Sequence, residues 1–471
     1  MTEAYTWADH RIFEAAIGPG SKALLFGTDH ASLFALNGST RDVLARWRER
    51  KTIILRKAPS PDREVLEALR DALVLVPASP RRQPARAPID PADIPLGTLV
   101  LEVAQACNLR CAYCYAGGGS YGGKSRLMRP EIARRAARHL VESSGDLRQV
   151  TLVLFGGEPL LNLPALRAAV LEAEAAVKEA GKRLVVSLTT NGTRFTPTLL
   201  DFLQEHRVGI TVSIDGPPDI HDANRRYAGG RDRVTYTDVV HGLALLGAHA
   251  SRPPVARVTL TPGQWSRIPE VFGHVLGLGF LEVGIAPVSP VTAGLLPTTR
   301  QDEALFAGFS RLAGQFRQEA AEGRVLPFSN LLDLLARLHC GRVKSTPCGA
   351  GLGYLAIDAG GRFFLCHRLA GEDEFQVGNL DAGIDHAKIG AFLAGEAASR
   401  VQACGACWAR SLCAGGCHYE NHLREARLGL PPGGSCDFIR RWLEIGVRVY
   451  ADLRSDPDNP VLAFLARRAE G

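Results

Sequence analysis

Short runs rich in β-branched residues alternate with longer helical patterns from Leu96 to about Ala321. Each run has the length and composition expected of a buried strand. The six predicted strands are Thr98–Val103, Val150–Phe155, Arg183–Thr189, Gly209–Ile214, Ala256–Thr261 and Phe280–Ile285. The alternation predicts an α/β fold in which six β/α units form a parallel sheet with helical crossovers. Ligands of such a sheet lie at the carboxyl ends of its strands.

The first 80 residues carry a different pattern. The predicted elements are strands Lys22–Phe26 and Ser32–Leu36, a helix capped near Ser39 or Thr40, and a second helix from Pro61 onward. They predict a small winged-helix-like module at residues 1–80. The stretch from Pro77 to Pro95 is rich in Pro and Arg. Because each Pro removes a backbone donor and restrains the residue before it, residues 81–95 are predicted to be an extended linker.

After Arg324 the periodicity weakens and Gly becomes frequent. Eight of the eleven cysteines lie in this region, between Cys340 and Cys436. A loop-rich segment cannot rely on a large core, so we expect bound metal to stabilise it. The predicted domains after the linker are a partial (β/α)6 TIM-type barrel at residues 96–325, a Cys-rich domain at 326–455 and a tail at 456–471.

Composition narrows the possible functions. The chain has 471 residues, of which 46% are hydrophobic and 22% charged, and this balance excludes disorder and coiled coil. The net charge is +6, but the Arg residues are scattered, so no nucleic-acid partner is predicted. We expect a cytoplasmic protein with no membrane partner, since no signal-peptide core or membrane-length apolar run is present. In a reducing compartment the cysteines are expected to be metal ligands or catalytic groups.

Three cysteines follow the first predicted strand, in the sequence Cys107-Asn-Leu-Arg-Cys111-Ala-Tyr-Cys114. Three thiolates within eight residues can hold a 4Fe-4S cluster and leave one of its four irons without a protein ligand. An open coordination position distinguishes a reactive metal centre from a structural one. The alternative is a structural zinc or cluster site whose fourth ligand comes from a distant part of the chain.

This motif, with an aromatic residue before its last Cys, resembles that of the radical S-adenosylmethionine (radical SAM) enzymes. In that family the open iron chelates the amino and carboxylate groups of SAM, and the reduced cluster cleaves SAM to a 5′-deoxyadenosyl radical. The radical then removes a hydrogen atom from the substrate. The resemblance implies that Cys107, Cys111 and Cys114 bind the cluster and that Tyr113 lies near the adenine.

Further motifs at strand ends resemble the SAM-binding motifs of the same family. Gly156, Gly157 and Glu158, within Phe155–Pro159, resemble the motif that binds the SAM amino group. The other implied SAM-binding residues are Asn191, Ser213, Asp215, Arg225 for the carboxylate with Arg226 as a possible substitute, and Thr259. Each strand-end motif could also be an ordinary turn. Thr259 could equally be a sheet threonine.

The eight later cysteines allow two interpretations. Cys404-x2-Cys407-x5-Cys413-x3-Cys417 alone could be a four-thiolate zinc site. The whole string, from Cys348 through Gly361 and Cys366 to Cys436, resembles the SPASM extension of radical SAM enzymes that modify peptides. This resemblance implies two auxiliary 4Fe-4S clusters, the first held by Cys340, Cys348, Cys366 and Cys417 and the second by Cys404, Cys407, Cys413 and Cys436. Full ligation would leave neither cluster an iron for substrate, so electron transfer is their expected role.

Two features point to a substrate class. The module, through Leu33–Asn37, resembles peptide-recognition domains of maturases that act on ribosomally made peptides, although it could instead serve packing or dimerisation. Sulfatase-maturing enzymes share the cysteine framework but place Asp after the Cys that corresponds to Cys366, where this chain has His367. The pair Cys366-His367 resembles the dipeptide found at this position in the maturases that form thioethers. His367 is the candidate catalytic base, or it only packs beside the cluster.

The expected partners are therefore a ribosomally made Cys-rich peptide or small protein and an external electron donor of flavodoxin or ferredoxin type. Formylglycine formation, as in sulfatase maturation, is the alternative reaction. If the protein is not an enzyme, the alternative is a zinc-stapled binding protein or an electron carrier. Such a protein would give no reason for the strand-end motifs at Gly156, Gly157, Glu158 and Arg225.

Overall fold

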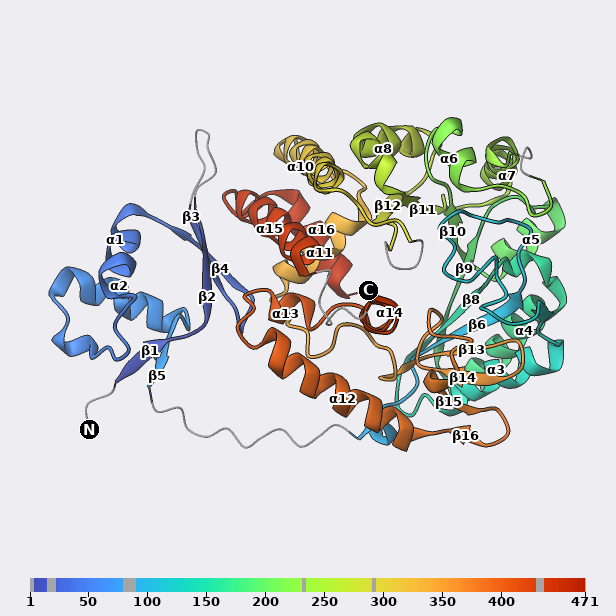
Figure 1. The fold of residues 1–471 in the computed structure, drawn as a ribbon, viewed down its shortest axis with the longest axis horizontal. Coiled ribbons are helices and arrows are strands. Elements are labelled where there is room, and N and C mark those ends of the chain that lie inside the picture. Colours follow the sequence, from blue (N-terminus) through green and yellow to red (C-terminus); the bar gives the residue numbers. More distant parts are fainter. Residues whose placement is uncertain are drawn as a thin grey trace.

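Six parallel strands form the sheet on the right of the view in Figure 1. The computed structural model describes residues 4–14, 23–78, 90–230, 234–289, 294–428 and 436–470. The sheet follows the order β12-β11-β10-β9-β8-β6. Its strands are β6 (Thr98–Gln105), β8 (Gln149–Gly156), β9 (Arg183–Thr190), β10 (Gly209–Ser213), β11 (Val255–Leu260) and β12 (Glu282–Pro287). All six predicted strands are confirmed, and so is the α/β class with a parallel sheet.

The crossover segments between these strands are helical, because they carry apolar residues at helical spacing and strong N-terminal signals. The helices that follow the strands are α3 (Pro130–Glu142), α4 (Leu163–Ala180), α5 (Pro197–Glu205), α6 (Pro218–Asn224), α7 (Tyr236–His249), α8 (Ile268–Gly277) and α10 (Thr299–Ala321). Short 3₁₀ helices η3 (Pro159–Leu161) and η4 (Pro262–Arg267) follow β8 and β11. Thr196 caps α5 by accepting a hydrogen bond from the Leu199 amide, 3.4 Å away.

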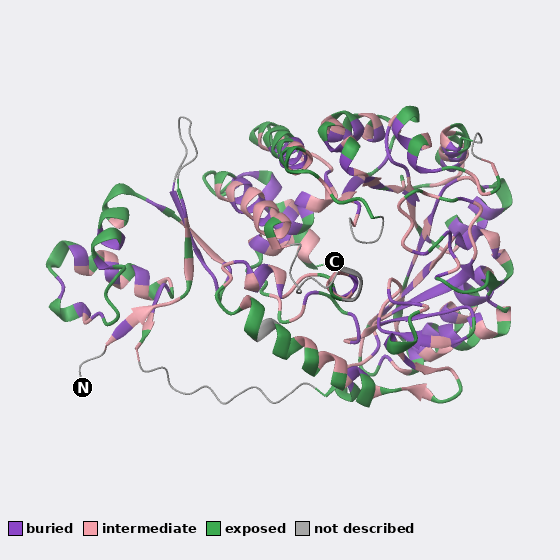
Figure 2. Cartoon of the chain, viewed as in Figure 1, coloured by how far each residue is buried: buried purple, intermediate pink, exposed green. Residues whose placement is uncertain are grey.

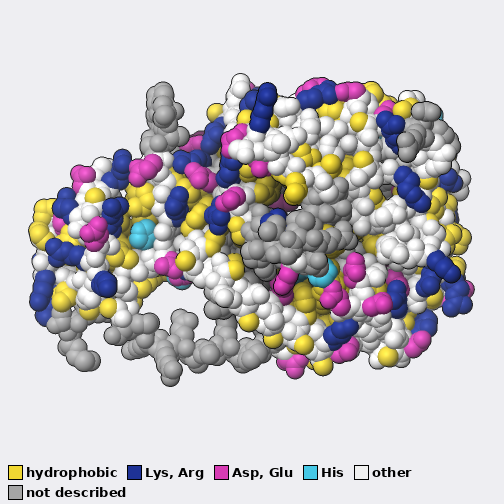
Figure 3. All heavy atoms as spheres, viewed as in Figure 1, with side chains coloured by type: hydrophobic (Ala, Val, Ile, Leu, Met, Phe, Trp, Pro, Cys, Tyr) yellow, Lys and Arg dark blue, Asp and Glu magenta, His cyan; other side chains and the backbone are white. Residues whose placement is uncertain are grey.

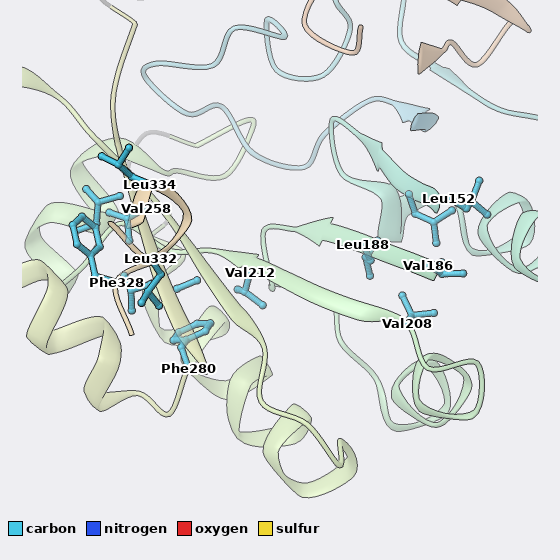
Figure 4. Packing of buried hydrophobic residues seen from close by; sticks show 14 of the residues in the cluster. Leu152, Val186, Leu188, Val208, Val212, Val258, Phe280, Phe328, Leu332 and Leu334 are labelled. Carbon is cyan, nitrogen blue, oxygen red and sulfur yellow. The ribbon is translucent and has the colours of Figure 1, made fainter. Parts of the chain in front are cut away.

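Alternate residues of the strands divide between the helices and the interior of the sheet's curve. In β8, Val150, Leu152 and Leu154 are fully buried, whereas the residues between them are partly exposed. Such a period of two is the geometry of a strand with two unlike faces. Figure 4 shows Leu152, Val186 and Leu188 in one packed cluster, and Figure 2 shows the central strands as largely buried. The less buried face is the one available to a ligand.

The Cys-rich region extends this sheet. The strand β13 (Tyr354–Ile357) pairs in parallel with β6, and three antiparallel strands continue outward from it: β14 (Arg362–Phe364), β15 (Gln376–Asn379) and β16 (Gly383–Ile384). A two-residue strand, β7 (Arg126–Leu127), pairs with the end of β6. The sequence pattern did not predict these strands, because each has two to four residues and too few positions to show a period.

The N-terminal module has its own small core, with Leu25, Ile53 and Leu66 fully buried. Its elements are β1 (Tyr5–Trp7), β2 (His10–Phe13), β3 (Ala23–Gly27), β4 (Ser32–Leu36), α1 (Gly38–Trp47), η1 (Leu55–Lys57), α2 (Ser60–Asp71) and β5 (Leu75–Pro77). The order β2-β3-β4 is antiparallel, and β1 pairs with β5. The predicted cap at Ser39 or Thr40 is wrong: Asn37 caps α1 by accepting from the Thr40 amide at 2.8 Å.

Much of the predicted linker, residues 79–89, lies outside the described residues, as does Lys22. At the end of that stretch, Pro91–Asp93 form the 3₁₀ helix η2, capped by Asp90. The proposed boundary between linker and barrel therefore falls inside a folded segment.

Helices surround the cysteines of the C-terminal region. They are α11 (Ser329–His339), η5 (Asp373–Phe375), α12 (His386–Cys404), α13 (Arg410–Cys413), α14 (His418–Leu428), α15 (Cys436–Leu453) and α16 (Pro460–Glu470). The last helix corrects the description of residues 456–471 as a tail, because Val461 and Leu465 are fully buried in the main core. Asn459 secures its start by donating to the Ala320 carbonyl at 2.9 Å.

The distribution of charged side chains on the surface and the polarity of the helices agree with what the composition predicts. On the face shown in Figure 3, Lys and Arg side chains are interspersed with Asp and Glu rather than gathered in a single-sign patch. Within the described ranges, no helix combines the length and apolar character needed to cross a membrane.

Candidate active site

A cavity of about 430 Å³ opens at the carboxyl ends of the parallel strands. It is lined by residues from β8 to β12, from the loop after β6, and from the Cys-rich region. The predicted site residues that line it are Cys107, Cys111, Tyr113, Cys114, Gly156, Gly157, Asn191, Ser213, Arg225, Thr259 and His367. Residues predicted separately along more than 250 positions of sequence thus meet at one place.

The three cysteines of the first motif present partly buried thiols to this cavity. Backbone amides approach two of the sulfurs: Leu109 N lies 3.3 Å from Cys107 Sγ, and Gly118 N lies 3.4 Å from Cys114 Sγ. Such N–H donors tune the cysteine ligands of iron–sulfur clusters. Burial raises the pKa of Cys107 to about 12 and that of Cys111 to about 11. Buried thiols such as these lose their protons when a bound metal supplies positive charge. The three cysteine side chains therefore suit the ligands of an iron–sulfur cluster.

The glycines after β8 allow two backbone segments to touch. Gly156 has a φ of +131°, and a Cβ there would lie 2.4 Å from the Ala104 carbonyl oxygen. A Cβ on Gly157 would lie 2.4 Å from the Ala106 carbonyl oxygen. Only glycine fits such an approach. The end of β8 therefore packs directly against the chain that leads into Cys107.

Glu158 lies behind the cavity wall rather than in it. Its carboxylate is fully buried and accepts hydrogen bonds from the Leu160 amide (3.0 Å), the Thr190 hydroxyl (2.7 Å) and the Asn191 amide (2.7 Å). Burial raises the pKa of Glu158, while these three bonds favour its charged form. The side chain joins the ends of β8 and β9 and so fixes Asn191, whose side-chain Nδ2 is 3.9 Å from Cys107 Sγ.

Asp215 organises the opposite wall of the cavity. It is fully buried, receives the Tyr113 hydroxyl at 2.5 Å and the Thr259 amide at 3.0 Å, and lies 3.1 Å from Arg225 Nε. The Arg225 guanidinium also lies 5.5 Å from the centre of the Tyr113 ring and 4.0 Å from Cys111 Sγ. Asp215 thus positions three of the predicted residues at once. Arg226 instead donates to the Asp222 carbonyl at 2.9 Å.

His221 is a positioning residue that the sequence did not identify. Its Nδ1 lies 3.2 Å from the Asp215 amide and its Nε2 lies 3.0 Å from the Thr235 hydroxyl. Burial lowers the pKa of His221 to about 4, so the ring is neutral at physiological pH. A neutral ring can accept from the Asp215 amide, which fixes the turn after β10.

The Cys-rich region supplies the remaining wall. His367 lines the cavity with its ring centroid 4.9 Å from that of Phe155, and its Nδ1 lies 2.6 Å from the Tyr354 hydroxyl oxygen. Burial, and then the nearby Arg368, lower the pKa of His367 to about 4. Sequence reasoning missed four residues that also line the cavity: Tyr115, Arg257, Arg368 and Glu420. The position of Arg257, two residues before Thr259 on the same face of β11, was the one available signal.

The eight later cysteines fall into two groups. Cys404, Cys407, Cys413 and Cys436 line a second cavity of about 310 Å³. This is the set predicted for the second auxiliary cluster. The charges of the other three, after burial itself, contribute to the raised pKa of Cys436.

In the first predicted set, Cys366 interacts with Cys348 and Cys417, and burial raises its pKa to about 12. Arg368 Nη1 lies 3.8 Å from Cys417 Sγ. Cys340 is exposed at the C-terminal end of α11. The charges of Cys348 and Cys417 contribute to the raised pKa of Cys366, but among the described residues no group of three or more such side chains is arranged to hold a single metal ion, so the ligand set, Cys340 included, stays a prediction.

Comparison with known proteins gives the class. Residues 101–263 match the model of the radical SAM superfamily. The serine-type anaerobic sulfatase-maturating enzyme of Klebsiella aerogenes is 24% identical over 369 residues, which cover 77% of this chain and 86% of that protein. The cysteine-type enzyme of Clostridium perfringens is 28% identical over 145 residues, 29% of this chain and 38% of that protein. The solved structure of anSMEcpe with bound AdoMet has a TM-score of 0.63 at 19% identity, covering 79% of this chain and 98% of that one, and shows the shared fold.

The chain is therefore an enzyme, and its residues 101–263 are similar to the radical SAM superfamily. Within the superfamily its homologues include maturases, and the family implies a 4Fe-4S cluster and SAM as cofactors.

Proposed function

We propose that this enzyme is a peptide maturase that joins a Cys sulfur to a carbon of another residue in the same chain, forming a thioether. The proposed targets are the side-chain methylene carbons of Asp or Glu in a small Cys-rich protein, such as the small subunit of quinohemoprotein amine dehydrogenase. The observation that carries the proposal is His367, which follows Cys366 directly and lines the cavity. Sulfatase-maturing enzymes have Asp at the corresponding position.

The residues of the cavity suit the two cofactors. Cys107, Cys111 and Cys114 would hold the cluster, and the backbone at Gly156–Gly157 with Arg225 would hold the ends of SAM. When bound, the cluster and SAM supply the radical that removes a hydrogen atom from the substrate. The chain encloses the target carbon among strand ends, which excludes water from a reactive intermediate.

Thioether formation also releases a proton from the substrate thiol. His367 is our candidate for accepting it, because it lines the cavity and, with Nδ1–H donating to the Tyr354 hydroxyl, its Nε2 would carry the lone pair that accepts the proton. The single electron left over goes to an acceptor, a role we assign to the auxiliary centres at the eight later cysteines. The N-terminal module is proposed to bind the leader segment of the same peptide at a strand edge.

Formylglycine formation is the second candidate, since the sulfatase-maturating relatives align along most of this chain. The two reactions give different products. A thioether forms with the loss of two hydrogens and the sulfur is retained, whereas formylglycine from Cys loses the sulfur and carries an aldehyde.

The test is anaerobic turnover with SAM, dithionite and the small Cys-rich subunit of quinohemoprotein amine dehydrogenase, followed by mass spectrometry. We expect loss of two hydrogens per bond, resistance of the linked Cys to alkylation, and no reaction with a hydrazide. An aldehyde product that reacts with the hydrazide would replace the proposal with the second candidate.

A further inference from the structure

Three arginines line the cavity, and two of them form ion pairs with a carboxylate. Arg225 lies 3.1 Å from Asp215, and Arg368 lies 2.8 Å from Glu420. Arg257 lines the same cavity from β11, but among the described residues no carboxylate forms an ion pair or hydrogen bond with its side chain. Its side chain is exposed inside the cavity, whose walls strengthen the attraction of a cation for an anion. Arg257 therefore leaves one positive charge in this cavity without a carboxylate partner among the described residues.

Arg257 points into open space rather than into packing. It belongs to the less buried face of β11, between the buried residues Ala256 and Val258, and its side chain is exposed to the cavity. Gly284, its paired residue in β12, lies beside the guanidinium: a Cβ there would lie 3.7 Å from Arg257 Nη1, an ordinary contact distance. The side chain is thus accessible to a ligand inside the cavity.

The surroundings make a counterion favourable. Burial, and then repulsion by Arg368, lower the pKa of Arg257, so its charge is held in an unfavourable place. Glu420 is shared with Ser289, whose hydroxyl donates to it, and is already paired with Arg368. A bound anion would relieve the charge on Arg257 without breaking an existing pair.

We infer that Arg257 is the residue that recognises the carboxylate of the substrate's acidic side chain, with Arg368 completing a cationic wall. A planar guanidinium can accept a carboxylate through two parallel hydrogen bonds, which fixes its orientation as well as its position. Holding the carboxylate of Asp or Glu would place the adjacent methylene carbon in a defined position in the cavity. This inference rests on the proposed function, since formylglycine formation acts on a residue without a carboxylate.

The test uses two synthetic peptides, each with one Cys and either one Asp or one Asn at the same position. Fluorescently labelled peptide is titrated into the full-length, cluster-loaded and SAM-bound enzyme without reductant. We expect the wild type to bind the Asp peptide about tenfold more tightly than the Asn peptide. In Arg257→Gln this ratio should fall to about one while the affinity for the Asn peptide is unchanged.

Arg252→Gln is the matched control, because Arg252 is an exposed arginine just before the same strand and should keep the tenfold ratio. Arg257→Lys keeps the charge without the planar fork and should restore part of the ratio. Iron content and melting temperature are compared for all variants. A ratio of one in the wild type, or an equal loss of affinity for both peptides in Arg257→Gln, overturns the inference. So does a loss of SAM affinity in Arg257→Gln by equilibrium dialysis, which would assign Arg257 to the SAM carboxylate.

Adding reductant separates this inference from the proposed function. If the Asp peptide is bound selectively through Arg257 but never loses two hydrogens, the carboxylate subsite stands and the thioether reaction fails. If the Asp peptide is cross-linked and Arg257→Gln leaves the preference for Asp over Asn unchanged, the reaction stands and the subsite fails.

Discussion

At the scale of single residues, the site depends on backbone contacts that exclude any side chain. The loop after Cys114 and the end of β8 approach so closely that a Cβ on Gly157 would lie 2.6 Å from the Gly119 Cα. This contact sets the position of the Cys107 loop relative to Asn191 and Glu158. The geometry of the metal site is thus fixed by residues that have no side chain to contribute.

We expect Gly156→Ala to destabilise the enzyme. The φ of +131° alone should cost about 1–3 kcal/mol of unfolding free energy, and contact with the Ala104 carbonyl adds to this cost. Urea unfolding followed by circular dichroism measures the change. Gly247→Ala in α7 is the control, since a Cβ there would have no atom within 4 Å, and it should be neutral or stabilising by up to about 1 kcal/mol. Equal stability of the two variants would contradict the steric argument.

Replacing Cys107, Cys111 and Cys114 together by Ala should remove about four iron atoms per chain and abolish 5′-deoxyadenosine formation. The reason is that these thiols converge on one cavity, separate from the cavity of Cys404, Cys407, Cys413 and Cys436. Iron analysis and chromatography of the SAM products provide the measurement. Full iron content with retained cleavage of SAM would show that the cluster lies elsewhere.

At the scale of elements, sequence patterns were informative where an element was long enough to show a period. The strands β6, β8 and β9 have eight residues each, and their apolar runs predicted them directly. The strands β13 to β16 escaped prediction because they are short, and only the pairing of β13 with β6 joins distant parts of the sequence. The strand-end motifs located most of the cavity, whereas Arg257 and Glu420 carry no motif and are defined only by the fold.

The N-terminal module is held against the rest of the molecule by apolar, aromatic and ionic contacts, and its Phe13, Leu24 and Phe26 belong to the main core. Trp408 packs edge-on against Phe13 and Phe26, with ring centroids 5.1 and 5.8 Å apart. Arg410 bridges Asp9 and Asp29 at 2.7 and 2.6 Å. Each ion pair is partly exposed and is worth at most about 1 kcal/mol, whereas Phe13 and Phe26 are buried, so the apolar contacts carry more of the docking.

We expect Asp9→Asn with Asp29→Asn to loosen this docking while the module stays folded, because both residues lie outside its core. Limited proteolysis should cut between the module and the barrel several-fold faster than in the wild type, an effect of about 1 kcal/mol. Asp71→Asn is a control on the same module, paired with Arg70 within the module. Unchanged cleavage in the double variant would show that the aromatic contacts alone hold the module.

At the scale of the whole molecule, the Cys-rich region is part of the catalytic cavity. It adds β13 to the edge of the barrel sheet beside β6, and its segment between β14 and β15 carries Cys366, His367 and Arg368. His367 and Arg368 line the cavity together with the Cys107 loop. A metal centre at Cys348, Cys366 and Cys417 would therefore stabilise a wall of the site, apart from any role in electron transfer.

This arrangement predicts unequal effects for the two auxiliary sites. Cys366→Ala should release the segment that positions His367 and Arg368, so SAM would still be cleaved but cross-linked product per 5′-deoxyadenosine should fall more than about tenfold. Cys413→Ala alters the separate cavity and should leave peptide binding and SAM affinity within about twofold of the wild type. Anaerobic turnover with quantified product and 5′-deoxyadenosine, together with SAM dialysis, distinguishes the variants. Equal coupling ratios in both would mean that the auxiliary centres act only as electron acceptors, because a structural role at the cavity wall belongs to Cys366 alone.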